Sequence, residues 1–546
     1  MTLVRSRYPL AILAGLLLAA SFPKIGIAGF AWIAPGLMLA ATLGKRGGES
    51  FRLGYAAGLA HYLASLYWLL LIPVTGFPVL GWVTLSAFVA LYPATWVWLV
   101  FRISDFNLQI SDTESNWLAA IEQMSSWGWS RRTFWAMTGA AIWVALEMII
   151  ARLLGGFPWN LLGVSQFQLV PLIQIASVTG VYGISFLLVW VSLSLIGAVS
   201  SIIFKPALRS AWLGEIILPL VAVAALFVFG FHRLSQSEPP SRELNVTLVQ
   251  PSIPQTLIWD ASENTNRFRQ LIELSERALA EKTDLLVWPE AALPSFDEES
   301  FTAITNLIRK HRVWMIFGAD DAEERPHATG SNKYDYYNAA FLFNPEGHYA
   351  AVYRKQNLVI FGEYIPLARW LPFLKLFTPI EGGFTPGDRA VPFELSDLKV
   401  KTSVLICFED IFPHLARGYA TDDTDFLVNL TNDGWFGEGA AQWQQAAAAI
   451  FRTVENGLPL VRCANTGLTG WADGHGRLRR IFADKNGSVY GAGFMAVKIP
   501  LLAAGEKRPR TFYNQHGDWF GWACMGFAAM TLIRNAVRRK GEQSRL

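Results

Sequence analysis

Three side chains with complementary chemistry lie in the second half of the sequence, each at the predicted end of a strand. They are Glu290 in V-W-P-E, Lys355 in Y-R-K-Q-N-L and Cys407 in V-L-I-C-F-E-D. A thiolate is a nucleophile, a carboxylate can take the thiol proton, and an ammonium can stabilise the oxyanion of a tetrahedral intermediate. Together these groups favour acyl transfer through a thioester. A helix beginning near Pro413 and a nearby cation would favour the thiolate form of Cys407.

Each residue alone also has a simpler interpretation. An isolated cysteine in a strand is usually a small buried hydrophobe, whereas a Glu after a strand or a Lys in a hairpin is usually solvated. A Cys–His pair, with His414 or His475 as the base, is the main chemical alternative. Residue types and spacing alone therefore leave both an enzyme and a non-catalytic domain open.

The composition excludes several classes of partner and cofactor. The 46 Lys and Arg residues against 43 Asp and Glu give a formal net charge of only +3, which is not the basic field that nucleic-acid binding requires. The three cysteines, Cys407, Cys463 and Cys524, form no C-x-x-C pair, and no H-E-x-x-H occurs. We therefore expect no disulfide framework, no metal site and no nucleic-acid partner.

Long apolar stretches indicate a membrane protein. The 546 residues contain 16% charged residues, and the mean hydropathy is +0.29. Stretches suited to crossing about 30 Å of hydrocarbon occur at 8–21, 25–43, 55–72, 79–101, 134–153, 178–203, 213–231 and 517–533. The first resembles a signal peptide, but the next apolar run follows so closely that an uncleaved span is favoured.

Basic residues predict the orientation of these eight spans. With eight spans, all of the following fall on one side: Arg5, Arg7, Lys45, Arg46, Arg52, Arg102, Arg131, Arg132, Lys205, Arg209, Arg534, Arg538, Arg539, Lys540 and Arg545. The positive-inside rule then places both termini in the cytoplasm. We expect a membrane domain at 1–232 with seven spans, an extracytoplasmic domain at 233–516, and an eighth span with a basic tail at 517–546.

Two features of the membrane region have open interpretations. The connection 104–132 is long, and its middle, at 116–124, forms either a short interfacial helix or a mobile loop. Glu147 lies inside an apolar span, where a carboxylate is costly. It has either a functional role or a structural hydrogen bond between helices.

After residue 240 the pattern changes to short strands that alternate with amphipathic segments. Strands are predicted at 245–250, 285–288, 313–318, 339–343, 402–407, 426–430 and 458–463, and helices at 262–281, 298–311 and 440–456. This alternation is typical of an α/β domain. The turn sequence N-P-E-G at 344–347 predicts a hairpin that leads up to Lys355.

The three reactive segments together resemble the nitrilase superfamily, whose members use a Glu–Lys–Cys triad in this order on an α-β-β-α sandwich. With the membrane spans, the chain resembles the apolipoprotein N-acyltransferases of the bacterial inner membrane. Further motifs carry this resemblance along the chain: G-F-P-W at 156–159, I-P-Q-T-L-I-W-D at 253–260, W-P-E-A-A-L-P at 288–294, F-G-E-Y-I-P at 361–366, C-F-E-D at 407–410, T-N-D-G-W-F-G at 431–437 and A-N-T-G at 464–467.

The resemblance implies a role for each matched residue. Cys407 corresponds to the nucleophile, Glu290 to the general base and Lys355 to the cation that stabilises the oxyanion. Substrate-binding or supporting positions are also implied, each with a structural role as the alternative: Trp259, Glu363, Glu409, Trp435 and Glu455. The implied reaction moves a fatty acyl chain from a phospholipid, through a Cys thioester, to the amine of S-diacylglyceryl-cysteine in apolipoproteins. No cofactor is implied, because the donor is already an ester.

The apolar segment 364–384 follows Lys355 inside the predicted outer domain. It either admits lipid from the outer leaflet or packs as an ordinary loop. The alternatives to the acyltransferase are a membrane-tethered nitrilase-type amidase and a non-catalytic receptor or assembly scaffold. An amidase for soluble substrates would not need the membrane spans, and a scaffold would not need all three reactive residues.

Overall fold

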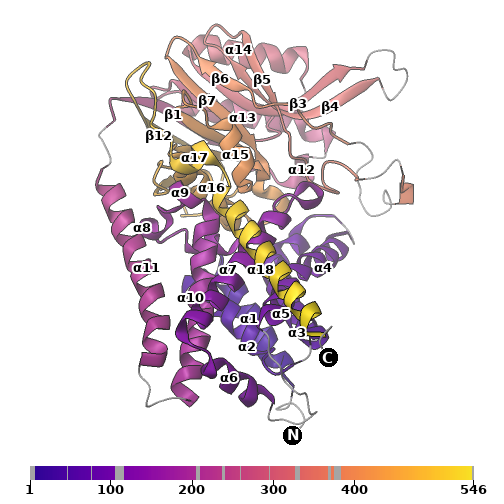
Figure 1. Ribbon diagram of the computed structural model, residues 1–546. Coiled ribbons are helices and arrows are strands. Elements are labelled where there is room, and N and C mark those ends of the chain that lie inside the picture. Colours follow the sequence, from indigo (N-terminus) through magenta and orange to yellow (C-terminus); the bar gives the residue numbers. More distant parts are fainter. Residues whose placement is uncertain are drawn as a thin grey trace. The chain divides into compact units, whose positions relative to one another are not determined.

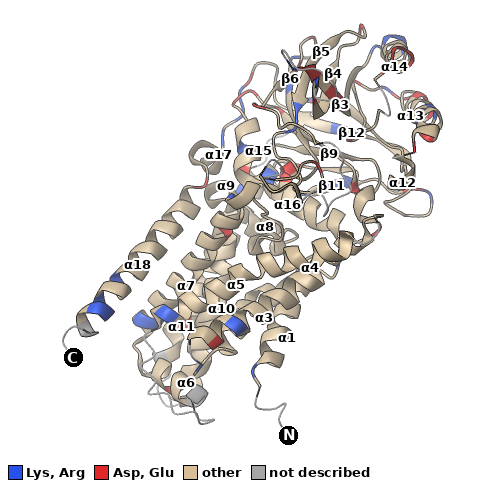
Figure 2. Ribbon diagram, turned by 90° about the vertical axis from the view of Figure 1, so that its right-hand side faces the viewer, with Lys and Arg blue, Asp and Glu red and all other residues tan. Residues whose placement is uncertain are grey.

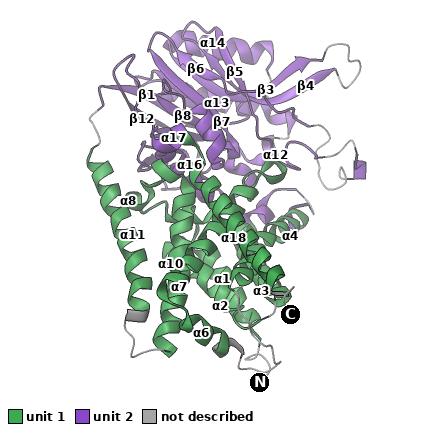
Figure 3. Ribbon diagram, in the orientation of Figure 1, with its two compact units in different colours: residues 1–67, 80–236, 516–546 green, residues 68–79, 237–515 purple. Residues whose placement is uncertain are grey.

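A computed structural model describes residues 6–45, 47–74, 77–104, 116–204, 210–236, 240–258, 260–293, 296–325, 333–366, 370–373 and 383–543 (Figure 1). The chain divides into two compact units (Figure 3). The helical unit comprises residues 1–67, 80–236 and 516–546, and the sandwich unit comprises residues 68–79 and 237–515.

The helical unit is built from apolar helices of very different lengths. Its helices are α1 (Tyr8–Ala20), α2 (Ala34–Ala40), α3 (Gly47–Ser65), α4 (Phe77–Val89), α5 (Leu91–Ile103), α6 (Asn116–Ser126), α7 (Trp129–Ile150), α8 (Val170–Ile173), α9 (Ala176–Thr179), α10 (Val181–Phe204), α11 (Ser210–Ser235) and α18 (Trp519–Gln543). Helices α1 and α3 approach closely at Gly15, where a Cβ atom would lie 2.0 Å from the carbonyl oxygen of Ala57. This helix contact therefore requires glycine, because even the single methyl group of alanine would overlap the backbone of α3.

Four helical segments in the described part of the chain are long and apolar enough to cross a membrane: Phe77–Ile103, Trp129–Ile150, Val181–Phe204 and Trp212–Ser235. The predicted stretch 25–43 is not one long helix. It forms a 3₁₀ turn (Ala28–Trp32) followed by the seven-residue α2, in which Pro35 occupies the first turn. Proline is suited to a helix start and not to a helix interior, which accounts for the break. The number of spans therefore stays a prediction.

The long connection 104–132 contains α6, so of the two alternatives at 116–124 the structure has the helix, while residues 105–115 lie outside the described residues. Arg539, near the end of α18, donates a 2.6 Å hydrogen bond to the carbonyl of Arg102, near the end of α5. Figure 2 shows basic residues gathered at this end of the helical unit. Two predicted cytoplasmic basic groups that are far apart in sequence are therefore neighbours.

Glu147 is buried in α7 and is hydrogen-bonded within the helical unit. Its Oε1 accepts from Trp143 Nε1 at 2.9 Å and from the backbone N–H of Leu162 at 2.7 Å. It also lines a cavity of about 40 Å³ together with His61 and Trp159. The carboxylate thus ties α7 to the chain segment that follows it, which supports the structural interpretation.

The sandwich unit contains two six-stranded sheets. The first has the order β12-β1-β2-β3-β4-β5 and the second the order β11-β10-β9-β8-β7-β6. The strands are β1 (Arg242–Gln250), β2 (Leu285–Val287), β3 (Trp314–Glu324), β4 (Tyr334–Phe343), β5 (Tyr349–Arg354), β6 (Pro392–Leu395), β7 (Val400–Ile406), β8 (Phe426–Thr431), β9 (Leu460–Ala464), β10 (Gly470–Ala472), β11 (Leu478–Ile481) and β12 (Gly493–Leu501).

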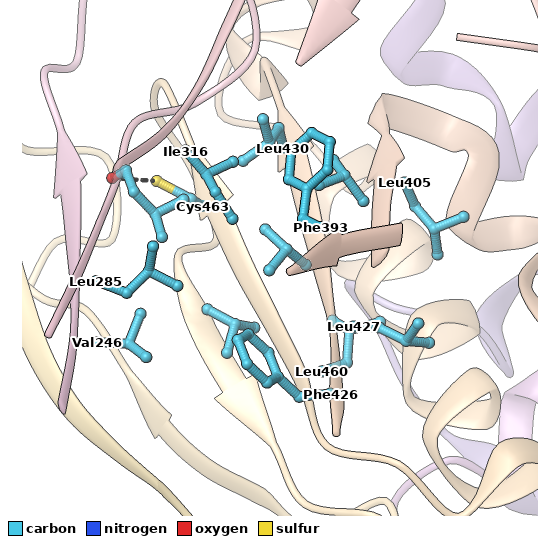
Figure 4. Close-up of a cluster of buried hydrophobic side chains, with 14 of the residues drawn as sticks. Val246, Leu285, Ile316, Phe393, Leu405, Phe426, Leu427, Leu430, Leu460 and Cys463 are labelled. Atoms are coloured by element: carbon cyan, nitrogen blue, oxygen red, sulfur yellow. Dashed lines mark hydrogen bonds between the residues drawn. The ribbon is translucent and has the colours of Figure 1, made fainter. Parts of the chain in front are cut away.

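Alternating side chains of the first sheet build two layers of core. Leu285 of β2 and Ile316 of β3 belong to the core between the sheets, in the same buried cluster as Phe426 of β8 (Figure 4). Their neighbours Leu286 and Phe317 pack on the opposite face, against α13 (Asn264–Ala278) and α14 (Glu298–His311). This is the two-residue period of a strand that is buried on both faces.

Helices α15 (Pro413–Tyr419) and α16 (Ala441–Asn456) pack against the second sheet, which completes the α-β-β-α architecture. Short helices α12 (Gln255–Ile258) and α17 (Phe512–His516) lie in the connections. All seven predicted strands and all three predicted helices of this unit are confirmed, and the β4–β5 hairpin leads to Lys355 as expected. Strands β6, β10, β11 and β12 were not predicted.

Candidate active site

Glu290 lies just past the end of β2, a short buried strand between two parallel neighbours. The backbone N–H of Trp288 donates to Ile316 at 2.9 Å, and that of Gly318 donates to the carbonyl of Pro289 at 3.1 Å. Gly318 of β3 lies against the backbone of Glu290, and a Cβ atom on Gly318 would be only 2.7 Å from the Glu290 Cα. Glycine on β3 thus allows the chain to bring Glu290 tightly against the sheet.

Lys355 directly follows β5 and is buried, with 1% of its surface exposed. Its backbone N–H donates to the carbonyl of Asn338 at 2.8 Å, which holds the residue at the end of the hairpin. Its Nζ lies 2.8 Å from Glu363 Oε1 and 3.4 Å from Glu290 Oε1. The hairpin therefore delivers a buried ammonium to two carboxylates.

Asn338 joins these carboxylates and was missed by sequence reasoning. Its Nδ2 donates to Glu290 Oε1 and to Glu363 Oε1, each at 2.8 Å. Glu363 Oε2 accepts from the backbone N–H of Val359 at 2.8 Å, so that both of its oxygens are fixed. The sequence does contain a signal for Asn338, because it begins the apolar run N-A-A-F-L-F of a predicted strand. A buried amide in a strand needs polar partners, and these partners indicate a polar site.

Cys407 is the first residue after β7 and has a φ of 52°, in the left-handed region that non-glycine residues rarely adopt. It begins a 3₁₀ turn (Cys407–Ile411), which precedes the helix predicted near Pro413. Its carbonyl accepts from Asn429 Nδ2 and from Gln445 Nε2, each at 2.8 Å. Side chains from β8 and α16 thus stabilise the strained turn that presents the thiol.

Electrostatics around the thiol contradict the thiolate expected from the sequence. Burial and the negative charge of Glu290 raise the pKa of Cys407, and Lys355 offsets this only in part. Burial also raises the pKa of Glu290 above its usual value, with a further contribution from Glu363. Burial alone would lower the pKa of Lys355, but Glu363 and Glu290 raise it overall. These shifts favour the protonated thiol of Cys407 and the charged ammonium of Lys355, so attack by Cys407 requires a base.

Glu409 is fully buried and links the cysteine turn to the segment after Lys355. Its carboxylate accepts from the Tyr353 hydroxyl at 2.9 Å and from the backbone N–H groups of Ile406 at 2.7 Å, Gln356 at 2.8 Å and Asn357 at 3.1 Å. Burial raises the pKa of Glu409 to about 7, against the lowering effect of these donors. The structure thus gives this residue a positioning role between two reactive segments.

A buried polar network behind the cysteine turn centres on Arg462 of β9, which sequence reasoning also missed. Its guanidinium donates to Asp410 at 3.0 Å, Asn429 at 2.8 Å, Asp433 at 2.8 Å and Gln445 at 3.2 Å. Two of these partners, Asn429 and Gln445, also donate hydrogen bonds to the carbonyl of Cys407. Because the network has two carboxylates and one cation, truncating Arg462 would leave buried charge unpaired.

The remaining supporting residues are spread out. Glu455 of α16 is buried in an ion pair with Arg452 at 2.8 Å, and Arg452 donates to the carbonyl of Ile411 at 3.1 Å. Glu455 therefore supports the end of the turn Cys407–Ile411 through Arg452. Trp435 is half-buried in the 3₁₀ turn Asp433–Phe436. Trp259 lies outside the described residues.

The two histidines of the alternative mechanism occupy other positions. His414 of α15 packs edge-on against Phe412, with ring centroids 5.9 Å apart. His475 lies after β10, where its backbone N–H binds Asp473 Oδ1 at 3.0 Å. The charges that act on Cys407 are chiefly those of Glu290, Lys355 and Glu363. In the described residues, no group of three His, Cys, Asp or Glu side chains is arranged to hold a metal ion.

A thiol, a carboxylate and an ammonium on the strand ends of an α-β-β-α sandwich define a carbon–nitrogen hydrolase-type enzyme. Residues 245–493 match the family model of the carbon-nitrogen hydrolases, and residues 14–194 match that of the apolipoprotein N-acyltransferase N-terminal domain. The chain is 35% identical to the apolipoprotein N-acyltransferase of Geobacter metallireducens, over 98% of this chain and 96% of that protein. The chain therefore belongs to the apolipoprotein N-acyltransferase family.

Other relatives and solved structures were also found. The apolipoprotein N-acyltransferase of Chlorobaculum tepidum is 27% identical, over 97% of each chain. Among solved structures, an amidase from Nesterenkonia is 15% identical, with a TM-score of 0.35 over 52% of this chain and 98% of that one. A nitrilase-superfamily protein of Saccharomyces cerevisiae is 18% identical, with a TM-score of 0.34 over 48% of this chain and 92% of that one.

Proposed function

We propose that this enzyme transfers a fatty acyl chain from a phospholipid to the N-terminal amine of S-diacylglyceryl-cysteine in apolipoproteins. The observation that carries the proposal is the pairing of a buried ammonium, Lys355, with Glu290 beside the raised-pKa thiol of Cys407. Family membership indicates lipoprotein N-acylation, and the apolar helices agree with a lipid donor.

In the first half-reaction, Cys407 attacks the ester carbonyl of the phospholipid. Glu290 takes the thiol proton as the sulfur–carbon bond forms, and Lys355 stabilises the oxyanion. The carbon–oxygen bond then breaks, and the leaving alkoxide receives the proton from Glu290. The products are a thioester on the enzyme and a lysophospholipid, so no cofactor is needed.

In the second half-reaction, the neutral α-amine of the apolipoprotein attacks the thioester carbonyl. The carbon–nitrogen bond forms and the carbon–sulfur bond breaks, while Glu290 accepts a proton from nitrogen and returns one to the sulfur. The two substrates use the same site in turn, which gives ping-pong kinetics. We propose that Glu363 and Asn338 fix the positions of the Glu290 carboxylate and the Lys355 ammonium relative to each other. We propose that Glu409 positions the turn that begins at Cys407.

The proposed topology has eight spans, both termini in the cytoplasm and the sandwich on the periplasmic side of the inner membrane. The proposed domains are 1–232, 233–516 and 517–546. The neighbouring ends of α5 and α18 support one cytoplasmic side, because they carry Arg102 and Arg539. A membrane-tethered amidase remains the alternative reaction, and it differs in releasing the acyl group to water.

The proposal predicts that purified enzyme gains the mass of one acyl chain when it is mixed with phospholipid vesicles. Peptide mapping should locate the added mass on Cys407, and a diacylglyceryl lipopeptide with a free amine should remove it as N-acylated product. If the acyl group on Cys407 is released to water at the same rate with and without lipopeptide, the amidase is favoured. Absence of any adduct and of any product would reject both enzymes.

Lipid entry gives a second prediction. In the segment 364–384, Trp370 is 79% exposed and Phe373 is 53% exposed, whereas residues 367–369 and 374–382 lie outside the described residues. Two aromatics in the membrane interface contribute roughly 2–4 kcal/mol of lipid contact. Replacing both by Ser should therefore slow acylation by vesicle phospholipid but not by a short-chain, water-soluble ester.

The matched control for this double variant is Tyr349→Ser, since Tyr349 is 54% exposed on the β4–β5 hairpin. This control variant should be acylated at the rate of the unaltered enzyme by vesicle phospholipid and by the water-soluble ester. Equal losses on the two donors in the Trp370/Phe373 variant, together with a lower melting temperature, would show a loop that only packs against the protein.

A further inference from the structure

The chain between α3 and α4 belongs to the sandwich unit, although most of α3 and α4 belongs to the helical unit (Figure 3). This connecting segment, residues 68–74, has the sequence W-L-L-L-I-P-V and begins within the 3₁₀ helix Tyr67–Leu71. Trp68 is the buried residue of that 3₁₀ helix, with 3% of its surface exposed. The segment therefore inserts one large side chain into the sandwich unit.

Trp68 makes two direct contacts there. Its indole Nε1 donates a hydrogen bond to Gln444 Oε1, in the first turn of α16, at 3.1 Å. Its ring packs edge-on against Phe436, with ring centroids 4.7 Å apart. Gly439 leaves room for this approach, because a Cβ atom on Gly439 would lie only 3.2 Å from the Trp68 Cβ. The indole is therefore held between the start of α16 and the turn Asp433–Phe436 that precedes it.

The hydrogen bond connects Trp68 to the reactive cysteine through two adjacent amides. Successive residues of a helix point about 100° apart, so Gln444 and Gln445 face different neighbours. Gln444 accepts from the indole, while Gln445 Nε2 donates to the carbonyl of Cys407 at 2.8 Å. Both glutamines are buried at the start of one helix. A displacement of Gln444 therefore also displaces Gln445.

The ring contact gives a second route to the same amide. Phe436 lies in the turn that Asp433 begins, and Asp433 accepts from Arg462 at 2.8 Å. The same guanidinium donates to Gln445 Oε1 at 3.2 Å. The hydrogen bond and the ring contact therefore converge on Gln445, which holds the carbonyl of Cys407.

We propose that Trp68 is a positioning residue for Cys407 and acts through Gln444 and Gln445 of α16. The inference rests on the proposed function and adds a residue from the connection between α3 and α4 to it. Cys407 has a φ of 52°, and a strained turn keeps its geometry only while its surroundings fix it. A displacement of a reacting group by about 1 Å costs on the order of 10²-fold in rate. The connecting segment thereby affects the reaction itself.

The test removes the indole N–H and keeps an aromatic ring against Phe436, in Trp68→Phe. The matched control is Trp82→Phe in α4, because Trp82 Nε1 donates to the carbonyl of Leu63 at 3.0 Å within the helical unit. Acylation of Cys407 is measured with phospholipid vesicles and with the short-chain, water-soluble ester. The maximal rate and the KM are determined for each donor, and thermal unfolding is recorded for each variant.

We expect Trp68→Phe to lower the maximal rate of acylation by about tenfold with both donors and to change both KM values by less than about twofold. Both donors react with the same thiol, so a misplaced thiol slows both. Trp82→Phe should react as the unaltered enzyme does. If only acylation by vesicle phospholipid slows, the segment contacts lipid, and the inference is overturned.

A double-mutant cycle with Gln444→Met tests the route from the indole to the cysteine. Methionine has a similar length, but its sulfur is only a weak acceptor. Gln444→Met alone should give the same loss of rate, which tests the route even if Trp68→Phe does not fold. In the Gln444→Met background, Trp68→Phe should slow acylation by less than about twofold, because the bond that it removes is already absent.

Three further results would overturn the inference: equal tenfold effects of Trp68→Phe in both backgrounds, a lower melting temperature with an unchanged rate, or the same loss of rate in Trp82→Phe. Failure of the inference is distinct from failure of the proposed function. In the first case the unaltered enzyme still forms acyl-Cys407 from phospholipid, whereas in the second it forms none.

Discussion

Replacing Cys407 by Ser is expected to reduce formation of the N-acylated product by more than about 10⁴-fold. A hydroxyl has a much higher pKa than a thiol, and burial and the Glu290 charge already raise the pKa of the group at this position. A serine acyl ester would also be a less reactive intermediate towards an amine. Product is measured as N-acylated lipopeptide by mass spectrometry, and the fold by thermal unfolding of the detergent-solubilised enzyme.

The matched control for this substitution is Cys463→Ser. Cys463 is also buried near the end of a strand (Figure 4). Its Sγ donates to the carbonyls of Val249 and Val287, each at 3.4 Å. A hydroxyl can keep a carbonyl contact there, so activity should persist. Full activity in Cys407→Ser, or equal loss in both variants, would contradict the thioester mechanism.

Glu290→Gln and Lys355→Met are expected to block formation of the thioester itself. Removing a general base costs about 10²–10⁴-fold in rate, and removing an oxyanion donor costs a comparable factor. Both residues act in the first tetrahedral intermediate, so acyl-Cys407 should not accumulate on mixing with phospholipid. In the unaltered enzyme, the acylation rate should fall as the pH is lowered through the raised pKa of Glu290, because only the carboxylate accepts the thiol proton.

Loss of Lys355 also leaves buried carboxylates unpaired, which by itself destabilises a fold by about 3–5 kcal/mol. The double variant Lys355→Met/Glu363→Gln removes one of these charges and separates the two effects. We expect it to recover thermal stability and to stay inactive. Recovery of acylation in the double variant would show that Lys355 is only structural, and wild-type accumulation of acyl-Cys407 in Glu290→Gln would remove the base assignment.

Much of the sandwich could be predicted because strands and helices leave periodic patterns in the sequence. The β2 segment and the first part of β3, residues 314–318, are continuous apolar runs because both of their faces are covered. The helix predicted at 298–311 has the observed bounds of α14, Glu298–His311. Strand β11 was missed because its residues are largely exposed, and β12 because its partner β1 lies about 250 residues away along the chain. The stretch 25–43 was long and apolar enough for one span, but Pro35 starts a new helix inside it.

The sequence by itself determined which segments carry Glu290, Lys355 and Cys407, since each has its own motif at a strand end. Only the tertiary structure decided which groups surround them. Strand register places Asn338 between two carboxylates and Asp320 opposite Asn338, and neither pairing leaves a local signal. The pKa of Cys407 also depends on the tertiary structure. Burial and the Glu290 charge raise it, because desolvation and Coulomb energy depend on distances between segments far apart in the chain.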